Sequence, residues 1–505
     1  MTKEPTTLRE GFEYRFSPVD PVAGAHIDPC SAAIYETIVA KGTDGAPRPW
    51  LAERWQVSAD GLEHRFFLRP DLRFHSGAAC DARAVVEALH QCRWGDARTR
   101  QIQYWDPVAT VTAEGEGVVV IRTHYPTTRV MPLLWGTHTT IFNPAMRSRL
   151  GSAYGSADAD GTGPFRLAEW SEDRVLARRA ETYAGTPMQL VGNGAGPPHL
   201  EAVEWVTALA PDERVSLLRE GRVDCLHAPP VEAIAELMAD ERFDVLSVPQ
   251  SSNVYLALNW SRRDLGFFEQ PVREAISLAI DRRALVDELV LGHGSPTFGP
   301  VPPGAEFYDD AADRSGQHDP ARAEALLDAA GWLRGQDGVR TRNGVGLRFE
   351  CVVQDDSVLI GAARFVQRQL ARIGVALTLE PIPPFAPFYA RLAQGPASFL
   401  SKWLWQDPID ALAGFTTTAS QPRPNWQRAS VPVLDHAFER FRQAVTAEEL
   451  TAAAATVQSL IARELPIIPL FTPADFFVRN RRVTGWQPIP HNLYPFYQDA
   501  RFLPR

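Results

Sequence analysis

The sequence predicts an α/β protein, in which strands and helices alternate along one chain. Three patterns support this prediction. Short runs rich in β-branched and aromatic residues, such as residues 65–68 and 117–122, are typical of strands. Apolar residues at helical spacing follow good capping residues such as Asp81 and Asp319. Glycine ends several of these helices, and after Gly374 the next strand begins at once.

In the first half of the chain, Pro70 ends the predicted strand 65–68, because proline has no backbone N–H to donate. A turn is predicted at His75-Ser76-Gly77. Asp81 then caps a helix over residues 82–92, whose apolar side chains share one face. The strand 117–122 follows this helix.

In the second half, Pro271 in a first helical turn predicts one long helix that closes near Gly292. Asp319-Pro320 begins another helix, and Gly331 ends it in the position that favours a left-handed residue. A third helix covers residues 365–373 and is followed directly by a strand over residues 375–379.

Composition and charge narrow the function class. The chain has 505 residues, of which 45% are hydrophobic and 22% charged, and its net charge of −10 argues against nucleic acid as a partner. No apolar run reaches the roughly 18 residues that a membrane helix needs. The only lysines are Lys3, Lys41 and Lys402, so nearly all basic residues are arginine, and a single arginine is weak evidence for a site.

The five cysteines have no metal-ligand spacing, and we expect buried free thiols in preference to a disulfide. The segment after Met1 lacks an apolar signal region. Two expectations follow. The protein is periplasmic or otherwise extracytoplasmic if an export signal was trimmed, and cytoplasmic if Met1 is its native start.

Catalytic motifs do not emerge from the sequence, and we expect a protein that is not an enzyme and needs no metal or cofactor. There is no GxSxG, HExxH, Walker loop or paired-cysteine motif. Gly192, Gly194 and Gly196 superficially suggest a phosphate loop. Pro197-Pro198 follow them, so no helix can begin there to hold a phosphate.

An ordered set of short motifs resembles the family 5 extracellular solute-binding proteins of ABC importers, the peptide, nickel and opine class. Each motif is weak alone, but together they follow the family's order over nearly the whole chain. They lie at residues 34–39, 50–55, 58–61, 67–69, 74–77, 161–165, 256–259, 272–275, 279–282, 319–320, 466–470 and 485–486.

This resemblance implies a two-lobed periplasmic-binding-protein-like fold (type II, cluster C) with an extra N-terminal subdomain. Residues 1–35, 160–258 and 476–505 would form the core of lobe I, residues 36–159 a subdomain inserted into it, and residues 259–475 lobe II. The glycines of Gly161-Thr162-Gly163-Pro164 would then allow a tight crossing between the lobes.

The resemblance also implies a function. The chain would be the solute-binding component of an ABC importer, a monomer that captures a small peptide or a peptide-like or opine-like ligand between its lobes. Hinge closure would then present the ligand to the membrane permease. Two alternatives stay open: a binder of a metal chelate of the nickel type, and a cytoplasmic non-transport descendant acting as a sensor or biosynthetic accessory.

Two segments resemble those that the family places at its ligand. In the first, Trp403 or Trp405 would form an aromatic wall, and Asp407 before a proline would shape the turn. Peptide binders carry an aspartate for the ligand's ammonium group where this chain has Leu404, so recognition of a free peptide N-terminus is in doubt.

The second segment, Gln421 to Arg428, holds Arg423, Asn425 and Arg428 between prolines. Two guanidinium groups and an amide suit a carboxylate or phosphate, since arginine offers a planar fork of donors. A solvated surface loop in an arginine-rich protein is an equally weighted interpretation.

The N-terminal half supplies further candidates. Arg98 and Arg100 fall where nickel- and opine-binding relatives place an arginine, and His138 lies in the stretch where those relatives have a second one. Tyr14 and His26 could face the ligand from lobe I, although ordinary packing is the favoured explanation for them and for His138.

Overall fold

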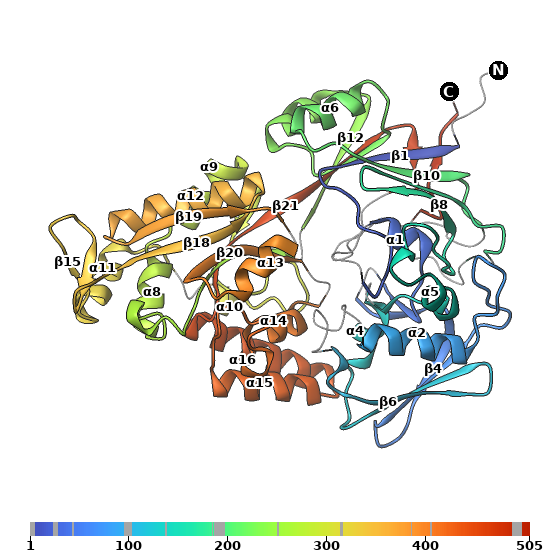
Figure 1. Ribbon diagram of the computed structural model, residues 1–505, viewed down its shortest axis with the longest axis horizontal. Coiled ribbons are helices and arrows are strands. Elements are labelled where there is room, and N and C mark those ends of the chain that lie inside the picture. Colours follow the sequence, from blue (N-terminus) through green and yellow to red (C-terminus); the bar gives the residue numbers. More distant parts are fainter. Residues whose placement is uncertain are drawn as a thin grey trace. The chain divides into compact units, whose positions relative to one another are not determined.

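The computed structural model describes residues 6–23, 29–42, 45–94, 104–136, 139–183, 185, 197–249, 252–313, 317–384, 386–404, 407–486 and 497–504. Its contacts divide the chain into two compact units. Unit 1 comprises Met1–Val248 and Asp475–Arg505, and unit 2 is the continuous segment Pro249–Ala474 (Figure 1).

The main sheet of unit 1 mixes parallel and antiparallel pairing. The first strand, β1, pairs in parallel with β11 on one side and β10 on the other, and β10, β9 and β8 continue as antiparallel neighbours. The strands, in sheet order, are β11 (Cys225–His227), β1 (Thr7–Phe12), β10 (Ala202–Thr207), β9 (Arg174–Arg179) and β8 (Phe165–Ser171).

A second, antiparallel sheet of unit 1 packs against helix α2 (Ala82–Trp94) (Figure 1). The Asp81 carboxylate accepts a hydrogen bond from the Ala84 backbone at 2.9 Å, which confirms the predicted cap. The predicted strands 65–68 and 117–122 lie within this sheet. Its strands, in order, are β4 (Ala52–Val57), β5 (Glu63–Leu68), β7 (Val118–Thr123) and β6 (Val108–Glu114).

The remaining elements of unit 1 are short. They are α1 (Pro29–Ile34), α4 (Val130–Trp135), α5 (Pro144–Leu150), α6 (Pro211–Arg219), α7 (Ile234–Ala239), β2 (Val39–Lys41), β3 (Pro47–Pro49), β12 (Phe243–Pro249), β22 (Val483–Thr484) and β23 (Arg501–Phe502).

The motif Gly161-Thr162-Gly163-Pro164 lies inside unit 1, so the expected role as a crossing between lobes is wrong. It packs instead against the end of α1. A Cβ atom on Gly163 would stand 2.6 Å from the Ala33 carbonyl oxygen, and one on Gly161 would collide with the Ile34 carbonyl. Glycine is required here because two backbone segments touch, and neither residue has a positive φ angle.

The turn at residues 74–77 meets the same motif. The His75 ring lies 2.9 Å from the Gly163 carbonyl oxygen, and the Ser76 hydroxyl donates to Asp160 at 2.6 Å. Motifs that are far apart in the sequence therefore pack on one another, and in this part of the chain they serve the architecture of unit 1.

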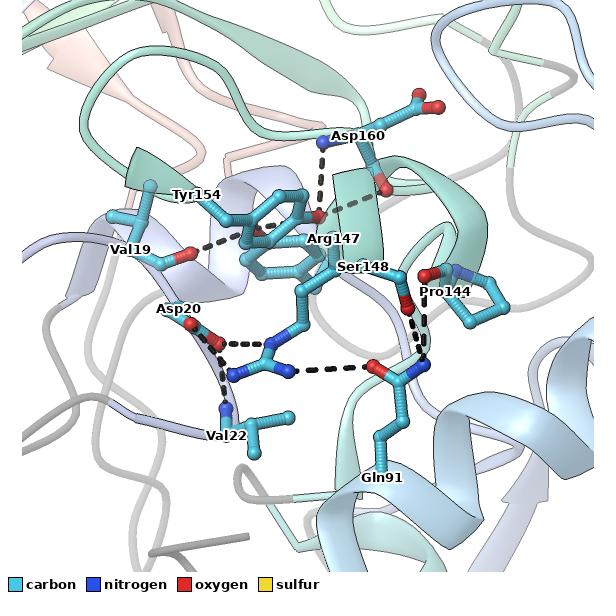
Figure 2. A network of polar contacts seen from close by, with 10 residues as sticks. Val19, Asp20, Val22, Gln91, Pro144, Arg147, Ser148, Tyr154 and Asp160 are labelled. Atoms are coloured by element: carbon cyan, nitrogen blue, oxygen red, sulfur yellow. Dashed lines mark hydrogen bonds and ion pairs between the residues drawn. The ribbon is translucent and has the colours of Figure 1, made fainter. Parts of the chain in front are cut away.

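A polar network fixes the chain near Asp20 in unit 1 (Figure 2). Arg147 donates two hydrogen bonds to the Asp20 carboxylate, at 2.9 and 3.0 Å, and lies 3.4 Å from Gln91 of α2. The Tyr35 hydroxyl donates to the Val19 carbonyl at 2.6 Å and contacts the Tyr154 hydroxyl. The segment around residues 19–22 is thereby held by the side chains of Tyr35 and Arg147.

Unit 2 is built on one sheet with a hydrophobic core on each face. Strand β13 is buried at every position, and its residues alternate between the two cores: Val254, Leu256 and Leu258 join one, Tyr255 and Ala257 the other. The strands, in order, are β19 (Ala376–Ile382), β18 (Arg348–Gln354), β20 (Ser398–Leu404), β13 (Ser252–Leu258) and β21 (Ile468–Asn480), of which the residues up to Ala474 belong to this unit, with β14 (Gly294–Pro296) also on β21.

Helices cover both faces of this sheet. Residues of α8 (Gln270–Leu278), α9 (Arg282–Val290), α11 (Pro320–Ala329) and α12 (Ser357–Arg372) belong to the first core. Those of α13 (Ala386–Ala393), α14 (Pro408–Thr416), α15 (Pro432–Gln443) and α16 (Ala447–Glu464) belong to the second. The smaller elements are α10 (Asp310–Asp313), β15 (Leu333–Arg334), β16 (Arg340–Arg342) and β17 (Val345–Gly346).

The single helix predicted from Pro271 to Gly292 is wrong, because the structure has two helices, α8 and α9. The Asp281 carboxylate accepts from the Ala284 backbone at 3.0 Å and so caps α9. The buried Arg282 guanidinium donates to the carbonyls of Ser277, in the last turn of α8, and of Ile280, which follows this helix.

Other predictions are confirmed. Asp319 caps α11 and Gly331 follows it with φ +81°, and Gly374 stands between α12 and β19 with φ +80°. Helix α12 begins at Ser357, earlier than predicted. All five cysteines are buried and free. No helix within the described ranges has the length and apolar character to cross a membrane.

Candidate ligand-binding site

The loop between α14 and α15, residues 417–431 of unit 2, holds most of the candidate residues and is braced from inside by Asn425. The side chain of Asn425 is fully buried. Its amide nitrogen donates to the carbonyls of Thr417 and Ala429, both at 2.8 Å, and its oxygen accepts from the Ala429 backbone at 3.0 Å. All three of these hydrogen bonds lie within the loop, so in this structure the Asn425 side chain stabilises the loop conformation.

Gln427 is the second brace. Gln427 is 1% exposed, and its side-chain amide donates to the Phe415 carbonyl at 2.6 Å. The backbone carbonyl of Gln427 accepts a hydrogen bond from the Trp260 backbone N–H at 2.8 Å. Residues 425, 427 and 429 are buried, whereas Trp426 is half-buried and Arg428 is exposed. This alternation turns Trp426 and Arg428 to the outer side of a loop that two amides fix.

Arg428 lies beside a second loop. Its guanidinium borders Gly395, where an added Cβ would be 3.2 Å from Nη2 and 3.6 Å from the Asn259 side chain. Arg428 itself has φ +54°. Over the residues that the structure describes, no carboxylate or hydrogen-bond acceptor pairs with this guanidinium. Arg428 is therefore an exposed cation beside Gly395 that no described carboxylate neutralises.

Arg423 belongs to a stack with two aromatic rings. Its guanidinium carbon lies 5.5 Å from the centroid of the Trp426 ring. The Trp426 ring in turn stacks on Tyr389 of α13, with centroids 6.4 Å apart and planes at 20°. Arg423 is exposed, and no described carboxylate pairs with it either.

Trp403 lies in the hydrophobic core against which Trp426 packs. It is 2% exposed and belongs to the core of unit 2 that contains Phe399 and Leu412. Its indole nitrogen finds no hydrogen-bond partner in the described part of the chain. Trp403 is therefore a core residue in this structure, and Trp405 is outside the described residues. Asp407 is buried at the start of α14, as expected of a residue that shapes the turn.

The candidates of the N-terminal half are mostly outside the described residues: Arg98, Arg100, His138 and His26. Tyr14 is half-buried in unit 1, where its ring lies 5.6 Å from that of Phe12 and 5.9 Å from that of Phe16. The structure thus brings together Arg423, Asn425 and Arg428 on one loop of unit 2, whereas Trp403 is a core residue of that unit and Tyr14 packs within unit 1.

Sequence reasoning missed two residues of this site, Trp426 and Tyr389. Trp426 stands between two candidates in the sequence, and a pattern of alternate burial in a proline-rich loop could have drawn attention to it. Nothing local marks Tyr389, because its contact with Trp426 joins α13 to a loop that follows in the chain.

A buried carboxyl group in unit 1 was also missed. Glu36 is 4% exposed, and burial raises its pKa to about 7, although Arg69 and a hydrogen bond from Tyr183 oppose the shift. Across the described ranges no group of three or more histidine, cysteine, aspartate or glutamate side chains is placed to hold a metal ion.

Comparison with known proteins gives consistent results. The model of the bacterial extracellular solute-binding proteins, family 5, matches residues 46–426. The glutathione-binding protein GsiB of Pectobacterium atrosepticum is 24% identical over 462 residues, which are 89% of this chain and 85% of that protein. The nickel-binding periplasmic protein of Escherichia coli strain K12 is 25% identical over 420 residues, 80% of this chain and 76% of that protein.

Among solved structures, the binding protein AgaA from Agrobacterium tumefaciens R10, in complex with agropinic acid, superposes with a TM-score of 0.83. It is 22% identical and the match covers 99% of both chains. This confirms the predicted two-lobed α/β fold of periplasmic binding proteins.

Proposed function

The chain belongs to the bacterial extracellular solute-binding proteins of family 5, and from this membership we propose that it captures a small peptide-like ligand with free carboxylates for an ABC importer. Members of this family bind peptides, opines, glutathione or nickel chelates and work with ABC permeases. The relatives named above are binding proteins. We extend this to the chain itself, as a periplasmic monomer without enzymatic activity.

The observation that carries the ligand class is the pair of unneutralised guanidinium groups on a braced loop. Arg423 and Arg428 are both exposed and have no described carboxylate partner. An arginine held in place by packing can receive a carboxylate through two parallel hydrogen bonds with little loss of side-chain freedom. This supports a ligand that presents carboxylates, such as a peptide, glutathione or an opine.

The nickel-chelate alternative is less well supported, because the two arginines suit an anionic organic ligand whether or not it carries a metal. The alternative of a cytoplasmic sensor or biosynthetic accessory has no observation in its favour. Nickel(II) with L-histidine therefore serves as the contrasting ligand in the test.

Calorimetric titration tests the proposal. We expect glutathione, the dipeptide Met-Leu or agropinic acid to bind the parent protein. Arg428→Ala or Arg423→Ala should weaken this binding by about two orders of magnitude, since removing the sole partner of a buried carboxylate costs on the order of 3 kcal/mol. The melting temperature without ligand should stay unchanged, because neither side chain is buried.

Arg263→Ala is the matched control. Arg263 is another exposed arginine of unit 2 beside an aromatic ring, and its loss should change affinity by less than about 1 kcal/mol. Parent-like binding by both loop variants would refute the anchoring role of the arginines. Binding of nickel(II) with L-histidine alone would refute the peptide-like ligand class.

A further inference from the structure

Trp426 offers an aromatic surface on the outer side of the braced loop, between Arg423 and Arg428 in the sequence. Trp403, the candidate drawn from the sequence, is enclosed in the core of unit 2. Trp426 is half-buried on the outer side of the loop, and Tyr389 beneath it is 44% exposed.

We propose that Trp426, stacked on Tyr389, is the surface against which the planar part of the ligand packs, and that it sets selectivity among carboxylate-bearing peptides. This inference rests on the proposed function and adds to it a specificity-determining residue. The planar part is an amide plane or a flat side chain, since such groups stack on an indole.

The loop is built to hold Trp426 still. The neighbouring residues Asn425 and Gln427 are buried, and their side chains are bonded to the carbonyls of Thr417, Ala429 and Phe415. The backbone on both sides of the indole is thus fixed. Tyr389, from a different element, stacks on the indole, with the two ring planes at 20° to each other. A ring fixed in this way loses little conformational entropy when a ligand stacks on it.

Charge and ring also act together. The Arg423 guanidinium lies 5.5 Å from the Trp426 ring centroid, so a carboxylate that reaches Arg423 brings the atoms next to it within reach of the indole. Arg428 lies two residues further along the same outer side of the loop. A ligand with a carboxylate at each arginine and a planar bond between them would use all three side chains.

Titration calorimetry with glutathione and with the dipeptide Met-Leu tests the inference. Trp426→Ala should weaken binding of glutathione by about tenfold or more, as is typical of an aromatic anchor. Trp426→Phe keeps a flat ring, so it should bind within about threefold of the parent. Tyr389→Ala should fall between them, because it removes the support of the indole and leaves the indole itself in place.

Phe268→Ala is the matched control, because Phe268 is an exposed ring of unit 2 that also lies under an arginine, Arg263, at 4.8 Å. It should bind glutathione like the parent. The ratio of the affinities for glutathione and Met-Leu separates a role in ligand selection from a purely structural role, which would leave this ratio unchanged. Trp426→Ala should change the ratio by about threefold or more, and Tyr389→Ala should change it in the same direction.

Three outcomes separate this inference from the proposed function. If the arginine variants lose binding while Trp426→Ala and Tyr389→Ala match the parent, the inference fails and the proposed function stands. If Trp426→Ala fails to fold, Tyr389→Ala decides, and an unchanged affinity ratio in that variant refutes the inference. If the parent binds neither glutathione nor Met-Leu, both the proposed function and the inference are overturned for these ligands.

Discussion

At the scale of single residues, Glu36 couples the stability of unit 1 to pH. Its carboxyl group has a pKa of about 7 in the folded protein and about 4.5 when it is unfolded and in water. Between these pH values the folded state holds a proton that the unfolded state has released. The free energy of unfolding therefore falls as pH rises, by on the order of 3 kcal/mol over the whole interval.

We expect Glu36→Gln to remove this dependence. The melting temperature of the variant should fall less than that of the parent between about pH 5 and 7, because an amide has no proton to release. Asp224, whose pKa burial raises to about 6, adds a slope of the same sign, so Asp224→Asn should flatten the curve separately. A Glu36→Gln curve parallel to that of the parent would contradict the shift.

Asn425 links stability to binding through the loop. Asn425→Ala removes two donated bonds and one accepted bond from a fully buried site. Unfolding in urea should show a loss of about 1–3 kcal/mol, since buried backbone groups are left unpaired. Glutathione binding should weaken as well, although the changed side chain contacts no ligand, because Trp426 and Arg428 are no longer held. Unchanged affinity in a destabilised variant would show that the brace does not matter for the site.

The proposed site could be predicted only as a segment of the chain. The prolines around Arg423 predicted a loop, which the structure has between α14 and α15, and the binding role of the two arginines stays a prediction. The direction of each side chain is not local. Trp403 lies on strand β20, where residues 398–401 are all buried and Lys402 is exposed, so burial along this strand does not follow a simple alternation from which the direction of Trp403 could be predicted.

At the scale of elements, the break between α8 and α9 depends on Arg282. The guanidinium of Arg282 donates to the carbonyls of Ser277, Ile280 and Pro469, and burial lowers its pKa to about 9. Arg282→Met should therefore cost more stability than Asp281→Ala, for which the loss of a cap predicts about 1 kcal/mol. Urea unfolding of both variants compares them, and an equal loss would argue against the role of the guanidinium.

Local signals predicted most element ends, but they did not predict the break between α8 and α9. Asp81, Asp319 and Gly374 act through bonds or dihedral angles within a few residues, so the sequence carries the full information. The break has one local mark, the capping residue Asp281, and one distant contact: the Arg282 guanidinium, which donates to the Ser277 carbonyl, also donates to the Pro469 carbonyl of β21. Pro469 is distant in the sequence, so its contact with Arg282 could not be predicted from local signals.

At the scale of the whole molecule, the two units differ in how much of the chain they need. Both hydrophobic cores of unit 2 consist of residues between Val254 and Phe471, within one continuous segment. A core of unit 1 includes Val478 of the returning chain. In addition, Trp486 and Tyr497 donate hydrogen bonds to the buried Glu10 carboxylate of β1. Unit 1 is therefore incomplete without its C-terminal segment.

This difference predicts the behaviour of two fragments. The segment 249–474 should fold alone, because it contains its own sheet and both cores, and domains with a complete core are independent folding units. The segment 1–248 should not, because the Glu10 carboxylate would be buried without the two groups that pair with it, at a cost of several kcal/mol. Circular dichroism and urea unfolding measure the folding of both fragments, and cooperative unfolding is expected only of the first.

The first fragment also carries Arg423, Trp426 and Arg428, so it should bind glutathione measurably but more weakly than the full chain. A well-folded fragment with no affinity would show that the contacts on unit 2 are insufficient by themselves, whereas a folded 1–248 fragment would refute the dependence of unit 1 on the returning chain.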